Sequence, residues 1–168
     1  MKLDQIDDKK LVLKAAQSVW AANKYFVLAC DQTAYRDVRQ LLRPDTQRLN
    51  EAYTLLQRID ATYQSTASEA LPELANALYH AAGYFKQLLS NERRQAINAL
   101  IRDQPAAALA ELERETTNYH VDYLLSSRLW PSQREKPFNH VPVRLTYQGQ
   151  VYEASELLWQ GDHVIRRT

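Results

Sequence analysis

The stretch Leu71–Leu89, LPELANALYHAAGYFKQLL, decides the fold class predicted for this chain. Its apolar residues recur at spacings of three and four, which is typical of the core-facing side of a helix. This apolar stripe consists of Leu74, Leu78, Ala81, Phe85 and Leu88. A second, more polar stripe lies roughly a quarter to a third of a turn away and holds Glu73, Asn76, His80, Gly83 and Gln87. We therefore expect a buried helix with one polar edge.

The polar edge carries two features of chemical interest. Asn76 and His80 stand four residues apart, so their side chains can meet on one helix face. Gly83 leaves the helix surface bare one turn beyond His80. A glycine inside a helix costs about 1 kcal/mol relative to alanine. Close approach of another backbone, or room for a ligand, would each explain its presence.

Composition limits the classes of function. The chain has 168 residues, 45% of them hydrophobic and 24% charged, which indicates one soluble domain with at most a small appendage. Its formal net charge of +1 gives no general attraction to nucleic acid or membranes, so such binding would depend on a local patch. The sequence shows neither a secretory signal nor a run of about 18 apolar residues, and we expect a cytoplasmic protein without a membrane partner.

Residue types also limit the cofactors. Cys30 is the single cysteine, so the chain predicts neither an internal disulfide nor a cysteine-built zinc or iron–sulfur site. Its expected position at a helix C-terminus has the wrong dipole for a thiolate, which favours a buried, unreactive thiol. The sequence lacks histidine pairs at metal-ligand spacing on one helix and lacks a glycine-rich phosphate loop. It therefore predicts no metal and no cofactor.

Periodicity along the chain predicts about six helices. They span roughly residues 8–30, 31–42, 46–63, 71–89, 90–104 and 105–130. Asp7 or Asp8 is expected to cap the first helix, and Asp45 or Thr46 the third. The inner stripe of the first helix includes Asn23, which needs a hydrogen-bond partner if it is buried. The last helix is expected to turn inward Leu109, Leu112, Thr116, Tyr119 and Tyr123.

Beyond the linker at residues 132–139 the pattern changes from helix to strand. Val143, Leu145 and Tyr147 alternate with polar residues, which is the period of a half-buried strand. Two further strands are expected within residues 150–159 and 163–167. Strands this short cannot bury enough surface alone, so they should pack on the helices or on a partner. The predicted fold is mainly α: a helical bundle in a 1–131 domain, with a small C-terminal antiparallel β meander in a 132–168 appendage.

Several short segments, taken together, resemble a known family. They are Asn23–Ala29 (NKYFVLA), Tyr35-Arg36, Asn76 with Tyr79-His80, Gly83–Lys86 (GYFK), and Tyr123–Leu125 followed by Arg128-Leu129. In order and spacing they resemble the YbgA-like family of bacterial proteins over roughly residues 19–131. The segment H-x-x-G-Y-F, which runs from His80 to Phe85, is the most specific of them.

The resemblance implies a domain of unknown function that is associated with nucleobase or nucleic-acid chemistry. Some YbgA-like relatives carry this domain after a cysteine-rich desulfidase domain that acts on thiouracil-type bases, and others are encoded near DNA photolyase. The chain departs from the family pattern at two positions. Cys30 and Leu74 stand where many relatives have histidines, which argues against a site built on several histidines.

His80 is the first candidate for chemistry. A histidine titrates near neutral pH and serves as a general acid or base, and Asn76 would orient this one. The structural alternative is a core histidine that donates to a carbonyl or to Asn76.

Cationic and aromatic residues suggest a ligand site. Lys24 can present an ammonium to an anion, or it can lay its stem over apolar surface. Arg36, beside Tyr35, offers a planar fork to phosphate or carboxylate, or it can bond a helix C-terminus or an acidic neighbour. The predicted ligand-binding set is completed by Tyr25, Gly83, Tyr84 and Lys86. Such residues are the ingredients of a nucleotide or single-stranded nucleic-acid site, and they are equally typical of an ordinary helix surface.

Three hypotheses follow. The first is a binding module accessory to nucleobase or nucleic-acid metabolism that holds an anionic, nucleotide-like ligand. The second is an enzyme in which His80 transfers a proton for a small substrate bound over Gly83. The third is a structural or interaction protein whose C-terminal strands pair with a partner or with a second copy. The first hypothesis expects one cavity that gathers Lys24, Arg36, Asn76, His80 and Lys86.

Overall fold

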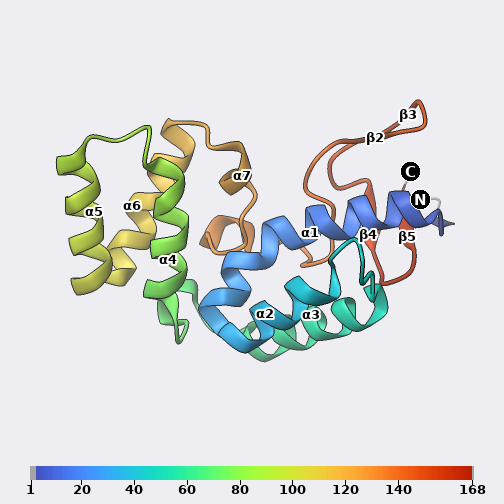
Figure 1. Cartoon of the computed structure of the whole chain (residues 1–168), viewed down its shortest axis with the longest axis horizontal. Coiled ribbons are helices and arrows are strands. Elements are labelled where there is room, and N and C mark those ends of the chain that lie inside the picture. The colour runs from blue at the N-terminus through green and yellow to red at the C-terminus, as the bar shows by residue number, and fades with distance from the viewer. Residues whose placement is uncertain (1–2, 168) are drawn as a thin grey trace.

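The computed structural model describes residues 3–167, and helices form most of its ordered elements (Figure 1). The α-helices are α1 (Lys9–Cys30), α2 (Gln32–Leu41), α3 (Leu49–Tyr63), α4 (Leu74–Ala82), α5 (Asn91–Asp103), α6 (Pro105–Asn118) and α7 (Asp122–Leu125). Three short 3-10 helices are η1 (Ser68–Ala70), η2 (Gly83–Phe85) and η3 (Pro131–Gln133). The strands are β1 (Leu3–Ile6), β2 (Leu145–Tyr147), β3 (Gln150–Tyr152), β4 (Leu157–Trp159) and β5 (Val164–Arg167). The predicted mainly α fold with C-terminal antiparallel strands is confirmed.

Helix α1 lies along the long axis of the molecule. Helices α4, α5 and α6 lie at its C-terminal end, and the strands lie at its N-terminal end (Figure 1). Asp8 begins it, as predicted, and accepts backbone hydrogen bonds from Lys10 and Leu11 at 3.0 and 3.2 Å. Asp31 follows the last turn and caps α2 by accepting from the Ala34 N–H at 3.0 Å. One aspartate therefore sets the corner between the first two helices.

The connection from α2 to α3 is longer than the sequence suggests. Residues 42–46 form turns, and Gln47 has a φ of 45°, in the left-handed region that a helix cannot contain. As a result α3 begins only at Leu49. Asp45 and Thr46, predicted as caps of this helix, lie in the turn, so that prediction is wrong.

The central stretch is α-helical only in its middle. After α4 the chain tightens into the 3-10 helix η2 and a turn, and α5 follows. The predicted core stripe is confirmed for its first four members: Leu74, Leu78, Ala81 and Phe85. Leu88 is instead exposed, because the chain leaves the helical path before it reaches this residue.

The last predicted helix is interrupted in the structure. Helix α6 ends just before His120, which has a φ of 49°, and the short α7 follows. The first three residues of the predicted inner stripe are buried: Leu109, Leu112 and Thr116. Tyr119 and Tyr123 are 44% and 43% exposed, so the prediction that they face inward is wrong. The left-handed residue between them redirects the chain and breaks the periodicity on which that prediction depends.

The strands form two antiparallel sheets. β1, β5 and β4 pair in that order, and β2 and β3 form a separate hairpin. The pattern of residues 3–6 does not predict β1, yet this strand pairs along β5, with Ile6 opposite Val164. Both ends of the described chain therefore meet in one sheet (Figure 1).

The C-terminal segment packs on α3 through aromatic and polar contacts. Trp159 of β4 is fully buried, and its ring meets that of Tyr53 edge to face with centroids 5.4 Å apart. Phe138 of the linker lies against the same tyrosine at 5.5 Å. At the start of α3, Asn50 accepts a hydrogen bond from the backbone of Asp162 at 2.9 Å. The strands are thus held by this chain's own helices.

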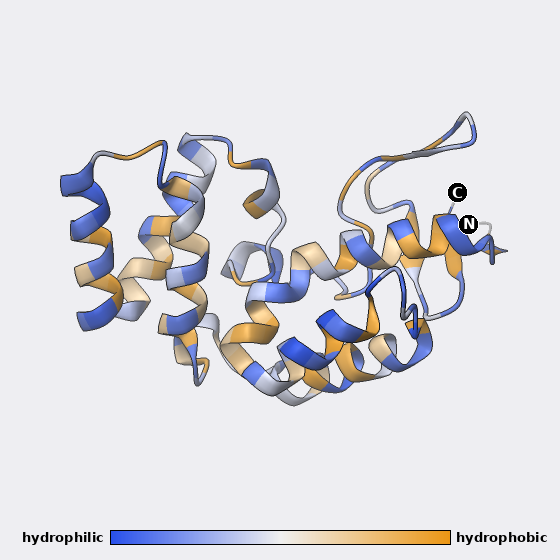
Figure 2. Ribbon diagram, in the orientation of Figure 1, coloured by the Kyte–Doolittle hydropathy of each residue, from blue (hydrophilic) through white to orange (hydrophobic). Residues whose placement is uncertain are grey.

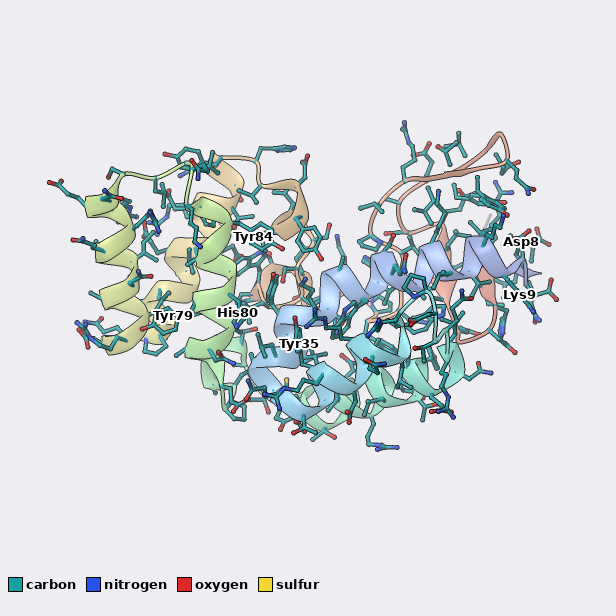
Figure 3. The ribbon with its side chains drawn as sticks, in the orientation of Figure 1. Asp8, Lys9, Tyr35, Tyr79, His80 and Tyr84 are labelled. Carbon is teal, nitrogen blue, oxygen red and sulfur yellow. The ribbon has the colours of Figure 1, made fainter. Side chains whose placement is uncertain are left out.

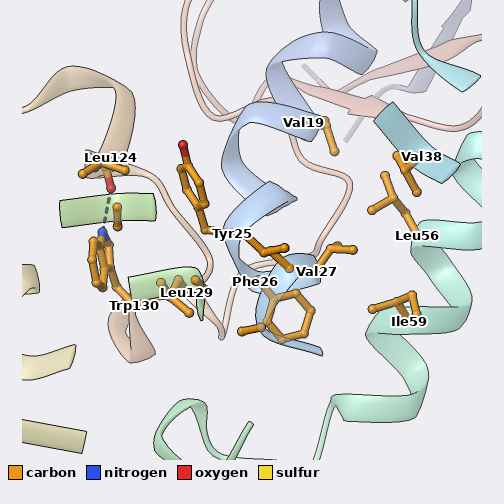
Figure 4. Close-up of a cluster of buried hydrophobic side chains, with 14 of the residues drawn as sticks. Val19, Tyr25, Phe26, Val27, Val38, Leu56, Ile59, Leu124, Leu129 and Trp130 are labelled. Carbon is orange, nitrogen blue, oxygen red and sulfur yellow. Dashed lines mark hydrogen bonds between the residues drawn. The ribbon is translucent and has the colours of Figure 1, made fainter. Parts of the chain in front are cut away.

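The apolar core continues across both sides of α1. Hydrophobic residues line the helix sides that face one another, and polar residues cover the outer sides (Figure 2). Around Tyr25, Phe26 and Val27 the core includes Val38, Leu56 and Ile59 on one side and Leu124, Leu129 and Trp130 on the other (Figure 4). The Trp130 indole donates to the Leu124 carbonyl at 2.7 Å, which satisfies its only polar atom.

His140 makes one part of this core sensitive to acid. It is 5% exposed, and neither ring nitrogen has a hydrogen-bond partner among residues 3–167. Burial, followed by the positive charges of Lys136, Arg128 and Arg167, lowers the pKa of His140 below its ordinary value of 6.5. Folding therefore disfavours the charged form of this imidazole.

We expect the free energy of unfolding to fall as the pH drops below 6.5, because the unfolded chain takes up a proton at His140 that the folded chain excludes. His140→Leu removes that proton and two unsatisfied nitrogens, and should raise stability at low pH by about 1 kcal/mol. Urea denaturation between about pH 5 and pH 8 measures the effect. The pH slope of the unsubstituted protein, measured alongside, is the reference. An unaltered pH slope in His140→Leu would contradict the prediction.

Candidate functional site

Four side chains from three elements meet where α1 approaches η2 and α7. Lys24 and Tyr25 come from the C-terminal half of α1, Tyr84 from η2 and Tyr123 from α7. We call these four residues the tyrosine cluster. The extension of α4 into η2 brings Tyr84 to α1, and the break after α6 brings Tyr123 there, so the cluster depends on both departures from regular helix.

The rings of the tyrosine cluster pack in a definite order. Tyr25 meets Tyr84 edge to face, with centroids 6.2 Å apart, and its hydroxyl donates to the Tyr84 hydroxyl at 3.0 Å. Tyr84 stacks on Tyr123 with centroids 5.3 Å apart and an angle of 15° between the rings. The Lys24 ammonium lies 5.1 Å from the ring centre of Tyr25 and 5.0 Å from that of Tyr123. Each of these cation–π contacts is worth about 0.5–1 kcal/mol at a solvent-exposed site.

The cluster has a buried member and two exposed ones. Tyr25 is 5% exposed, and burial, followed by the hydrogen bond to Tyr84, raises the pKa of its phenol well above the ordinary value. Tyr25 therefore stays protonated and holds the Tyr84 hydroxyl in place. Tyr84 and Tyr123 are 37% and 43% exposed, so solvent reaches part of both residues beside the Lys24 ammonium.

A cleft of about 340 Å³ adjoins Tyr123. It lies between α1, α7 and the segment that follows the linker, and Ser18, Ala21, Ala22, Asp122, Ser126, Pro142 and Val143 complete its lining. Apart from Tyr123, its walls are small or apolar, and the side chains that can hydrogen-bond are two serine hydroxyls, the Tyr123 hydroxyl and one carboxylate. Ala21 is three residues before Lys24 on α1, so the cleft lies one helical turn from the cation.

Tyr35 and His80 lie near the tyrosine cluster without belonging to it. Tyr35 packs on Trp20 of α1, with ring centroids 5.5 Å apart. In the view of Figure 3, Tyr84, His80 and Tyr35 follow one another along the junction of α4 with α1 and α2. His80 is exposed, which does not fit the core-histidine alternative, and no hydrogen bond described for residues 3–167 joins it to Asn76. Its proton-transfer role stays a prediction.

The remaining predicted ligand residues lie at two other places. Arg36 borders a surface hollow on the outer side of α2 with Arg39 and Arg43. Gly83 and Lys86 line a cavity between α4 and α5. The structure thus brings together Lys24, Tyr25 and Tyr84, and it places Arg36 and Lys86 elsewhere. The predicted residues are divided among several sites instead of one cavity.

Asn23, which the sequence predicts to need a partner, ties three segments together inside the core. Its amide nitrogen donates to the carbonyls of Val19 and Phe138 at 2.9 and 2.8 Å. Its amide oxygen accepts from the Arg128 guanidinium at 3.0 Å, and the same guanidinium nitrogen donates to Asp60 at 2.8 Å. The expectation of a hydrogen-bonded, buried asparagine is confirmed. We call Asn23, Asp60 and Arg128 the arginine network.

Two arginines enclose Phe26 beside this network. The guanidinium carbons of Arg128 and Arg134 lie 5.3 and 4.3 Å from its ring centre. Arg134 also donates to the Ser68 hydroxyl at 3.1 Å and to the Tyr63 carbonyl at 3.0 Å. The sequence patterns pointed to Arg128 only as part of a family segment, and they gave neither arginine a role. The available signal was Asn23, because a buried amide requires donors and acceptors from elsewhere in the chain.

Metal ligands and the single thiol were the other candidates for chemistry in the described part of the chain. Among residues 3–167 no group of three or more histidine, cysteine, aspartate or glutamate side chains is arranged to hold a metal ion. Cys30 is 4% exposed, which confirms the expectation of a buried thiol, and burial raises the pKa of this thiol to about 12. Within the same residues, no helix has the length and apolar character needed to cross a membrane.

Comparison with protein-family models places residues 24–131 in a family described as protein of unknown function, DUF1722. Searches of the curated proteins and of the solved structures give no match. The matched region includes every member of the tyrosine cluster, and it covers more than half of the 168 residues. The chain therefore belongs to the DUF1722 family of proteins of unknown function.

Proposed function

We propose that this chain is a bacterial, cytoplasmic binding module, accessory to nucleobase or nucleic-acid metabolism, that holds a nucleotide or a single-stranded nucleic acid. One observation carries the proposal: the exposed rings of Tyr84 and Tyr123 stack beside the ammonium of Lys24. A base would stack on an exposed ring, and the phosphate attached to it would lie at Lys24.

The chemistry of the surroundings supports this ligand class. Every nucleobase has a π face, and stacking on an aromatic side chain contributes about 1–3 kcal/mol per base. The cleft of about 340 Å³ beside Tyr123 is large enough for one base. Asp122 and Ser126 in its wall supply a hydrogen-bond acceptor and a hydroxyl for the edge of that base. Because the net charge is only +1, phosphate binding would depend on the local cation.

We further infer that the DUF1722 family is the YbgA-like family that the sequence resembles. The resembling segments from Tyr35-Arg36 to Arg128-Leu129 all lie inside the matched residues 24–131. The association of YbgA-like relatives with thiouracil-type bases and with photolyase supports a ligand that contains a base.

Fluorescence anisotropy with a labelled single-stranded DNA of about eight nucleotides tests the proposal. Tyr84→Ala and Tyr123→Ala should each weaken binding about tenfold, because each removes one stacking ring. Tyr79→Ala is the matched control, since Tyr79 is 44% exposed and lies outside the tyrosine cluster. Equal losses in all three variants, or no loss in the first two, would count against the proposal.

The salt dependence of binding tests the role of Lys24. Lys24→Gln should weaken binding at low salt and reduce the slope of log Kd against log salt concentration by about 1, because one phosphate contact is lost. Arg39→Gln, on the outer side of α2, is the control for a general loss of positive charge. The same change of slope in both variants would show that Lys24 makes no specific phosphate contact.

Protein pairing through the C-terminal strands is a second candidate function, favoured by the hairpin of β2 and β3. The hairpin projects from the body of the molecule (Figure 1), and Val143 and Val151 are 45% and 43% exposed. Light scattering of the intact chain separates a dimer from a monomer. A monomer over the whole concentration range would remove the homodimer form of this candidate.

A further inference from the structure

A separate cavity of about 210 Å³ is lined by residues of α4, η2, α5 and α6 and of the turn after η2. Its floor is apolar, since Phe85, Ile97 and Leu112 are at most 2% exposed. Lys86 and Arg94 stand in its walls, and among residues 3–167 no carboxylate lines it. None of its lining residues belongs to the tyrosine cluster. The cavity therefore combines an apolar floor with two positively charged side chains.

The two cations of this cavity lack acidic partners. Glu111, next to the floor residue Leu112, already pairs with Arg93 and Arg114. Among residues 3–167 neither Lys86 nor Arg94 forms an ion pair, and the contact of Arg94 with the amide oxygen of Asn91 is 3.5 Å long. An anion in the cavity would supply the missing negative charge.

Gly83 forms part of the wall and leaves room there. Its φ is −57°, an ordinary helical value, so the backbone does not require a glycine at this position. A Cβ placed on it would meet no atom within 4 Å. What glycine contributes is therefore open space beside the cavity. Of the two explanations offered for Gly83, room for a ligand agrees with this geometry, and close approach of another backbone does not.

We propose that this cavity binds a small aromatic monocarboxylate of the size of benzoate. An apolar cavity of about 150 Å³ accommodates benzene. The 210 Å³ available here leaves additional room for one carboxylate. The ring would pack on Phe85, Ile97 and Leu112, and the carboxylate would lie at Lys86 and Arg94. This site and its ligand are separate from the nucleotide site proposed above, so either proposal can fail while the other holds.

Titration of the ¹⁵N-labelled full chain with benzoate tests this inference. The expected result is saturable shifts of amide signals from the cavity, Gly83, Lys86 and Asn98 among them. Benzamide has the same ring without the charge and should bind at least about tenfold more weakly. Absence of saturable shifts, or equal affinity for benzamide, would overturn the inference.

Single substitutions test separately the two positive charges and the open space beside Gly83. Lys86→Gln and Arg94→Gln should each weaken benzoate binding about tenfold, because each removes one charge-assisted hydrogen bond. Arg39→Gln, away from the cavity, should leave it unchanged, and an equal loss there would show non-specific ion pairing and overturn the inference. Gly83→Leu should abolish binding by filling the space, and circular dichroism would verify its fold. Full benzoate affinity in the Lys86 and Arg94 variants would also overturn the inference. The affinity of the same proteins for the oligonucleotide is measured in parallel and tests the nucleotide site separately.

Discussion

Arg128→Met is expected to lower the free energy of unfolding by about 3–5 kcal/mol. The Arg128 side chain is 5% exposed and donates to both Asn23 and Asp60. Methionine fills a similar volume, yet it leaves the Asn23 oxygen and the Asp60 carboxylate without this donor. Such a loss costs more than the hydrogen bonds contribute, because Asn23 is 1% exposed and the Asp60 side chain only 24% exposed, so water compensates the lost donor only in part.

Urea denaturation of the two proteins measures this difference. Arg144→Met is the matched control, since Arg144 pairs with Glu153 at 3.1 Å on the surface and its loss should cost less than about 1 kcal/mol. Arg128→Lys keeps the charge without the planar fork, so it should restore only part of the stability. If the Arg128 and Arg144 variants lost equal, small amounts, the arginine network would have no structural importance.

Trp159→Ala should lower the free energy of unfolding by a similar amount, about 3–5 kcal/mol. Trp159 is fully buried, meets Tyr53 edge to face at 5.4 Å and donates its indole N–H to the Gly161 carbonyl at 2.7 Å. Alanine would leave a large cavity between β4 and α3 that the surrounding residues cannot fill. Since β4 pairs with β5, and β5 with β1, the loss should reach the whole three-stranded sheet.

The cooperativity of unfolding shows whether the strands and the helices form one unit. Far-ultraviolet circular dichroism follows the helices, and amide hydrogen exchange in β5 follows the sheet. We expect both to report the same destabilisation in Trp159→Ala. Leu158→Ala, at the neighbouring half-buried position, is the milder control. A sheet that exchanged freely while the helices kept wild-type stability would show that β1, β4 and β5 unfold independently of the helices.

Four consecutive residues of α1, Asn23 to Phe26, divide between structure and the candidate site. Asn23 belongs to the arginine network, and Phe26 lies between two guanidinium groups. Lys24 and Tyr25 belong to the tyrosine cluster. A helix turns by about 100° per residue, so neighbours in sequence point to different sides. This motif therefore does not have a single role. The hydrogen bond between Asn23 and Arg128 explains these two residues without a ligand.

The periodic spacing of apolar residues predicted those features of the fold that depend on residues close together in the sequence. The extent of α1, its Asp8 cap and the buried stripe from Leu74 to Phe85 follow from the spacing of apolar residues and from capping chemistry. The same reasoning failed at Tyr119 and Tyr123, because a left-handed residue at position 120 broke a helix that the pattern continued. Strand β1 escaped prediction because its partner β5 lies at the other end of the chain.

The sequence by itself determined the helical class, the need of Asn23 for a partner and the lack of a cysteine-built site, because each of these follows from residue type and spacing alone. The tertiary structure decided which side chains meet: Lys24 and Tyr25 with Tyr84 and Tyr123 in the tyrosine cluster, and Lys86 with Arg94 at a different cavity. The physical reason is that such meetings depend on where helices break and cross. If the helix continued regularly through Gly83 or His120, the side chains that follow would point to another side of the molecule. The local spacing of apolar residues does not show where the helix breaks.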